Sequence, residues 1–104
     1  MGITRAVLDE VAAERKNQTT KWGQQDPWDG TGSPAYRELA ALLQAQVDAL
    51  PGKNETPWNL ILLEEVYEAL AETDTALLRQ ELIQVAAVAV QWIEALDRRC
   101  HEPD

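Results

Sequence analysis

The segment from Leu82 to Leu96 most strongly constrains how this chain can fold. In that stretch only Gln84, Gln91 and Glu94 are strongly polar. A helix that is apolar on nearly every side is normally buried on nearly every side. A chain of 104 residues has room for one hydrophobic core and has difficulty surrounding such a helix completely. We therefore expect a single domain, residues 1–104, completed by a second copy in a homodimer or homotetramer.

The rest of the chain also predicts helices. Thr4 can cap a first helix that ends at about Trp22, before Gly23. The Ser33-Pro34 pair is typical of a helix start, and Thr56-Pro57 repeats the signal. The segment 23–33 is rich in glycine and without periodicity, which indicates a loop. We expect an all-α, four-helix antiparallel bundle with helices at about 4–22, 34–50 and 57–71, and a fourth from Thr73 or Asp74 to about Arg99.

The charge balance excludes several classes of function. Nine Lys and Arg residues against 18 Asp and Glu give a net charge of -9, which disfavours binding to a nucleic-acid backbone. An acidic protein can bind a polyphosphate when divalent cations neutralise the repulsion.

Cys100 is the only cysteine and there is one histidine, so no intrachain disulfide or self-contained zinc site is possible. The longest apolar run, 85–90, is too short to cross a bilayer, and no signal core is present; we expect a cytoplasmic protein without membrane association.

A group of carboxylates is the strongest chemical signal. Glu68 follows Glu65 by three residues and Glu64 by four, so their carboxylates project from neighbouring positions of one helix face. A short turn would place Glu81 of the next helix opposite them. Like charges beside apolar surface are costly unless a cation joins them, and hard divalent cations prefer oxygen ligands. The alternative is an ordinary solvated acidic face, since glutamate favours helices.

Two glutamines extend the polar positions of the last helix. Gln84 and Gln91 are seven residues apart and share a helical stripe with Glu81. On a buried helix, amide groups need hydrogen-bond partners. We consider two roles for them, a glutamine pair between helices or subunits and a contact with substrate.

Three segments carry a resemblance to a known family. They are Leu63-Glu-Glu-Val-Tyr-Glu-Ala-Leu70, the segment Leu78-Arg-Gln-Glu-Leu-Ile-Gln-Val85, and the head segment Glu14–Pro27. Together they resemble the MazG-like all-alpha nucleoside triphosphate pyrophosphohydrolases, in particular small bacterial and phage members. The similarity covers most of the chain, and the segment around 34–50 is its least distinctive part.

The resemblance implies a magnesium site in which Mn²⁺ can replace Mg²⁺. The family pattern is EExxE on one helix and ExxD on the next. Glu65 and Glu68 match ligands of the first motif, Glu64 the acid before them, and Glu81 the first ligand of the second. Gln84 stands where the family has Asp, which removes a charge and lowers the expected metal affinity.

The implied reaction converts a nucleoside triphosphate into a monophosphate and pyrophosphate. The attacking group would be water, oriented or deprotonated by metal or by a spare carboxylate such as Glu64. Two other readings remain open. One is a nucleotide-binding or regulatory relative with little turnover because of Gln84; the other is a helical interaction protein whose acidic stripe is only surface.

Basic and aromatic residues are needed to hold such a substrate. The candidates for phosphate contacts are Lys16, Lys21, Arg37, Lys53 and Arg79. Lys21 is preferred because it adjoins Trp22, which could stack on a base; packing in the core is the alternative for this tryptophan. We predict substrate contacts from Gln18, Lys21, Trp22, Arg79 and Gln91. Trp28 is predicted to lie in a lid or an interface, and Trp58 and Trp92 in the core.

Overall fold

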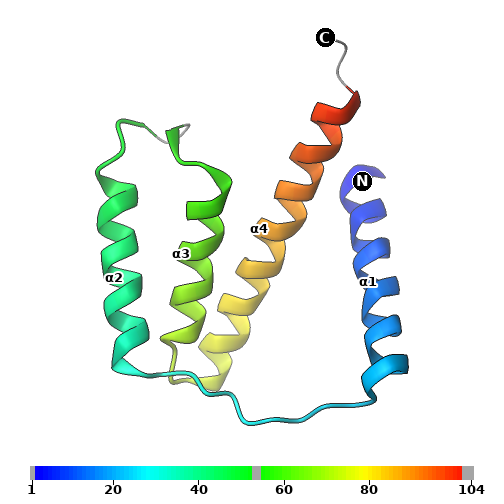
Figure 1. The fold of residues 1–104 in the computed structure, drawn as a ribbon, viewed down its shortest axis with the longest axis horizontal. Helices are drawn as coiled ribbons and strands as arrows, with labels where there is room; N and C mark the ends of the chain where they lie inside the picture. The colour runs from blue at the N-terminus through cyan, green and yellow to red at the C-terminus, as the bar shows by residue number, and fades with distance from the viewer. Residues whose placement is uncertain (1, 53–54, 102–104) are drawn as a thin grey trace. The chain divides into compact units, whose positions relative to one another are not determined.

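The protein is all-α in the part that its structure describes. The computed structural model describes residues 2–52 and 55–101, and within these ranges it contains four α-helices and no strand (Figure 1). The helices are α1 Gly2–Trp22, α2 Pro34–Asp48, α3 Trp58–Leu70 and α4 Thr75–His101. The predicted all-α class is confirmed. The finer prediction, a MazG-like bundle completed by another subunit, stays a prediction.

The helices fall into two compact units. One unit, residues 30–89, contains α2, α3 and the first part of α4; the other contains residues 1–29 and 90–104. In the first unit α2 packs against α3, and Leu43, Ala69 and Leu78 are buried. In the second unit the Thr4 hydroxyl donates a hydrogen bond of 2.7 Å to Glu94 Oε2. The expectation of one domain stays a prediction.

Several helix ends follow the predicted local signals. The Ser33 hydroxyl accepts a hydrogen bond from the Ala35 amide at 3.2 Å, and Pro34 is the first residue of α2. Gly23 has a φ of +73° and its amide donates to the Thr19 carbonyl, as expected for a glycine that ends a helix. Asp74 caps α4, because its Oδ1 accepts from the Leu77 amide at 3.1 Å.

Two predicted caps are wrong. Helix α1 already includes Gly2, so Thr4 lies inside the helix, where its hydroxyl bonds to a side chain instead of the backbone. Helix α3 begins at Trp58, and the residue before it, Pro57, has extended backbone and makes no side-chain cap. The last predicted residues of α2 and α3 shift by one or two positions, as helix ends commonly do.

The apolar helix α4 is far less buried in the single chain than its sequence suggests. Leu82 is 51% exposed and Ile83 is 55% exposed. The prediction that another subunit covers this surface is untested. Trp58 and Trp92 are half-buried, whereas Trp28 is 87% exposed. No helix of the described residues is long and apolar enough to cross a membrane.

Candidate metal centre

Three glutamates of the unit 30–89 meet where α3 runs beside the start of α4. Glu65 and Glu68 lie one turn apart on α3, and Glu81 lies on α4. One carboxylate oxygen from each residue can be chosen so that all three lie within 4.8 Å of one another. All three side chains are half-buried. The structure therefore brings together Glu65, Glu68 and Glu81, three of the four residues predicted as metal ligands, and we call them the glutamate cluster. The fourth, Gln84, is exposed on α4.

The short connection between the two helices sets this approach. In residues 71–74, Glu72 Oε1 accepts hydrogen bonds from the amides of Thr73, at 3.2 Å, and Asp74, at 3.4 Å. These bonds satisfy backbone donors in the turn, and Asp74 then caps α4. Because the connection is short, the chain reverses direction directly and Glu81 returns to the level of Glu68 and Glu65.

The carboxylates of the cluster destabilise one another's charged forms. Burial, together with the charges of Glu65, Glu81 and Glu64 and a hydrogen bond with Glu81, raises the pKa of Glu68 to about 7. Burial raises the pKa of Glu65 as well, with smaller contributions from Glu81 and Glu64. Glu68 is therefore half protonated near neutral pH in the metal-free protein, and a cation would compete with that proton.

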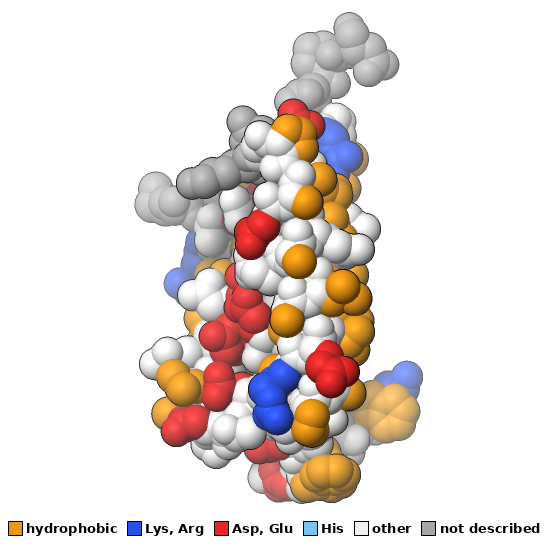
Figure 2. Space-filling view, turned by 90° about the vertical axis from the view of Figure 1, so that its left-hand side faces the viewer, with side chains coloured by type: hydrophobic (Ala, Val, Ile, Leu, Met, Phe, Trp, Pro, Cys, Tyr) orange, Lys and Arg blue, Asp and Glu red, His pale blue; other side chains and the backbone are white. Residues whose placement is uncertain are grey.

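Basic side chains do not neutralise the cluster. Across residues 2–52 and 55–101 a single ion pair occurs, between Arg5 and Asp9 on the exposed surface of α1. Figure 2 shows several Asp and Glu side chains close together on the face that it draws. The clustered negative charge thus has no protein counter-ion in the described part of the chain.

A cavity of about 530 Å³ adjoins the cluster. Its lining includes Glu68 and Glu81, the turn residues 71–73, and Arg37 and Ala40 of α2. This cavity is wide open to solvent and forms a shallow depression on the surface of the unit. Arg37 was one of five candidate phosphate contacts in the sequence but was not the preferred one. No local signal in the sequence could have singled it out, because its position depends on how α2 packs against α3.

The remaining residues predicted on these helices lie around the cluster. Glu64 is half-buried beside Glu65, and its charge raises the pKa of both Glu65 and Glu68. Gln84 lies one turn after Glu81 and is exposed in the single chain, as is Gln91 in the other unit. The expectation that these amides extend into a buried helix is therefore not met within one chain.

Three of the predicted substrate contacts, Gln18, Lys21 and Trp22, belong to the unit of residues 1–29 and 90–104. Lys21 Nζ lies 4.9 Å from the centre of the Trp22 ring, and Trp22 is 61% exposed. Gln18 accepts a hydrogen bond of 2.9 Å from Arg15, and it lines a cavity of about 320 Å³ together with Lys21 and Trp22. Trp22 is therefore not packed in the core of its own unit. Whether these residues share a site with the glutamates stays a prediction.

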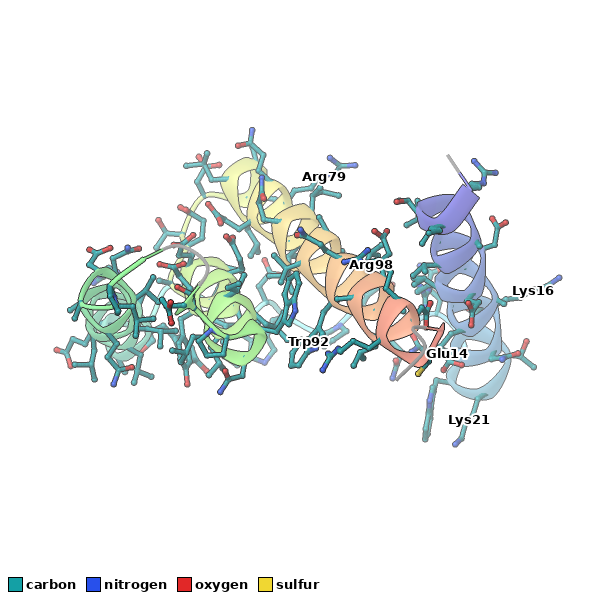
Figure 3. All side chains as sticks on the ribbon, turned by 90° about the horizontal axis from the view of Figure 1, so that it is seen from above. Glu14, Lys16, Lys21, Arg79, Trp92 and Arg98 are labelled. Carbon is teal, nitrogen blue, oxygen red and sulfur yellow. The ribbon has the colours of Figure 1, made fainter. Side chains whose placement is uncertain are left out.

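The other described candidate cations do not line the cavity beside the cluster. Arg79 is exposed on α4 and does not line that cavity. Figure 3 shows the side chains of Arg79 on α4 and of Lys16 and Lys21 on α1 extending outward from their helices. Lys53 lies outside the described residues. Of the four candidate phosphate contacts among the described residues, Arg37 is thus the one that lines this cavity together with Glu68 and Glu81.

Comparisons with family models, with curated proteins and with solved structures found no match to this chain. Assignment to the MazG-like family accordingly stays a prediction from the quoted motifs, and the geometry of the site must support any functional proposal.

Proposed function

We propose that the glutamate cluster binds Mg²⁺, or Mn²⁺ in its place, and that the protein hydrolyses a nucleoside triphosphate to a monophosphate and pyrophosphate. The observation that carries the proposal is the meeting of Glu65, Glu68 and Glu81 within 4.8 Å, half-buried and without a protein counter-ion in the described ranges. Such an arrangement is unfavourable for the apo protein, and a divalent cation would turn the repulsion into coordination.

The donor atoms fit a hard cation. Three carboxylates supply anionic oxygens, and Mg²⁺ in proteins commonly completes its coordination with water and substrate phosphates. Gln84, one turn from Glu81, can add only an uncharged amide oxygen. When bound, the cation would neutralise phosphate charge and make a nearby water more acidic. It would also allow a chain with a net charge of -9 to approach a triphosphate.

The protein's own contribution to the chemistry is general base catalysis. Glu64 lies next to Glu65 in sequence and is half-buried, yet it is not one of the three clustered ligands. Its carboxylate can orient a water and accept a proton from it as the water attacks phosphorus. The sequence contains no alternative such as a serine nucleophile motif, so water is the attacking group.

The proposal includes the MazG-like bundle completed by a second copy of the chain. Its support is the apolar surface of α4, where Leu77, Leu82 and Ile83 are 46–55% exposed. These side chains lie on different sides of the helix, and a helix that is apolar on several sides is normally covered on several sides. The expected assembly is a homodimer or homotetramer without bound nucleic acid, and light scattering coupled to size-exclusion chromatography measures it directly.

A regulatory or nucleotide-binding role is the second candidate. It is favoured by Gln84, which brings no charge and is exposed at the position where the family pattern has a charged ligand. In this case the protein would bind a triphosphate with its cation but release little pyrophosphate. Calorimetry with Mg²⁺ and triphosphates, combined with a pyrophosphate assay, separates the two candidates. It also separates both from a helical interaction protein, which would bind neither.

The decisive experiment is a screen of nucleoside triphosphates with Mg²⁺ or Mn²⁺, scored by pyrophosphate produced. Glu68→Gln and Glu81→Gln should each lower the rate by at least about 100-fold, because each removes an anionic ligand without changing side-chain size. Glu38→Gln, an exposed position on α2, is the matched control and should leave the rate unchanged. Full activity in both cluster variants would show that the site is elsewhere.

A further inference from the structure

The cavity beside the glutamate cluster also holds an arginine, and the backbone fixes its position. Arg37 Nη1 donates a hydrogen bond of 3.3 Å to the Gly32 carbonyl. The Gly32 amide in turn donates to the Leu70 carbonyl at 2.8 Å, at the end of α3. The segment before α2 is therefore tied to the α3–α4 connection. Arg37 is exposed, and it lines the cavity that Glu68 and Glu81 also line.

The arginine does not act as a counter-ion for the cluster. Although it shares a cavity with Glu68, Glu72 and Glu81, it forms no ion pair with any of them. Glu72 is engaged by the amides of Thr73 and Asp74 instead. The guanidinium has five donors, and the bond to Gly32 uses one of them. Most of its donor capacity is thus available to a ligand in the cavity.

A positive charge at this position is unfavourable for binding a cation alone. It is favourable for an anion that arrives together with the cation, because the anion would contact the metal on one side and the arginine on the other. The planar guanidinium fork matches phosphate oxygens in a bidentate arrangement. An arginine and two carboxylates of the glutamate cluster, Glu68 and Glu81, along one open cavity of about 530 Å³ therefore favour a polyphosphate ligand.

We propose that Arg37 contacts the polyphosphate tail of the substrate. The sequence alone made Arg37 one of five candidates for this contact and preferred Lys21. The inference rests on the proposed function for the cation site, and it goes further by naming the residue and the group that it recognises. Arg37 is here a substrate-contacting residue and takes no part in proton transfer.

The test is calorimetric titration of the full-length protein with two probes, Mn²⁺ alone and inorganic tripolyphosphate in the presence of Mn²⁺. Arg37→Ala should weaken tripolyphosphate binding by about 10- to 100-fold, the usual effect of losing a charge-assisted hydrogen bond. The same variant should bind Mn²⁺ alone as tightly as the wild type or more tightly, because a positive charge near the carboxylates is removed. Arg98→Ala, at an exposed position on α4, is the control and should leave both affinities within about twofold.

A second variant guards against misfolding. Arg37→Gln keeps a donor for the Gly32 carbonyl but lacks the charge, so it should fold and still weaken tripolyphosphate binding. Wild-type affinity for tripolyphosphate in either folded variant overturns the inference. A wild-type protein that binds Mn²⁺ but no tripolyphosphate also overturns it, while leaving the cation site intact. A protein that binds no Mn²⁺ at all would instead refute the proposed function, so the two failures are distinguishable.

Discussion

Replacing Glu68 by glutamine should have opposite effects on stability with and without a divalent cation. In the metal-free protein Glu68 is the most perturbed carboxyl of the cluster, with a pKa raised from 4.5 to about 7. When the pKa of a carboxyl is higher in the folded state than in the unfolded state, protonation of that carboxyl stabilises the fold. This contribution is fully present only below the pKa of the unfolded state. That contribution is lost as the pH rises through about 7. At pH 8 the charged Glu68 therefore destabilises the wild type, and Glu68→Gln removes the cost.

The size of this effect follows from the pKa. A tenfold change in an equilibrium constant is about 1.4 kcal/mol, so a rise from 4.5 to about 7 corresponds to at most about 3.4 kcal/mol at pH 8. Contact with water screens a half-buried group, and we expect about 1–2 kcal/mol. In a domain of about this size, a gain of about 1–2 kcal/mol in the free energy of unfolding raises the melting temperature of Glu68→Gln by roughly 4–16 °C. Most of the gain should disappear at pH 5, where Glu68 is protonated in the folded wild type.

When a divalent cation is present, the wild type should be more stable than Glu68→Gln. At a Mn²⁺ concentration 100 times its dissociation constant, binding stabilises the wild type by about 2.7 kcal/mol, whereas Glu68→Gln lacks a ligand and gains much less. The assay is thermal unfolding by circular dichroism in EDTA and in Mn²⁺, at pH 8 and pH 5, with Glu38→Gln as the control for an exposed glutamate. Equal melting temperatures for Glu68→Gln and Glu38→Gln in EDTA at pH 8 would refute the charge repulsion among the clustered glutamates, on which the metal assignment depends.

Three further predictions follow from the geometry. Gly32→Ala should cost about 1–3 kcal/mol in urea unfolding, because φ is +88° and an added Cβ would lie 2.8 Å from Thr73 Cγ2. Gly2→Ala, where a Cβ meets no atom within 4 Å, should change stability by less than about 1 kcal/mol; equal effects would contradict the close packing of Gly32. Mn²⁺ affinity should rise as the pH increases through about 7, since the cation displaces the Glu68 proton; a flat profile between pH 6 and 8 would count against Glu68 as a ligand. Gln84→Asp should tighten Mg²⁺ binding by about tenfold in calorimetry if the side chain reaches the site, and unchanged affinity would place it outside the coordination sphere.

Local sequence signals predicted the helices well because they act over a few residues. Ser33-Pro34, Gly23 and Asp74 each satisfy backbone groups of their own helix end, so their effect does not depend on the rest of the fold. The same reasoning placed Glu65 and Glu68 on one face of α3, since helical spacing alone sets that relation. It failed at Thr4, where a contact with Glu94, distant in sequence, takes the place of a local cap.

Contacts between helices were decided only by tertiary structure. The 71–74 connection brings Glu81 close enough to Glu68 to raise the pKa of Glu68. The packing of α2 against α3 brings Arg37 to the same cavity. The apolar pattern of α4 likewise predicted burial, whereas Leu82 and Ile83 remain exposed in the single chain. Periodicity records which residues share a face of one helix. It does not record which other helix that face meets, because that choice depends on the packing of many side chains at once.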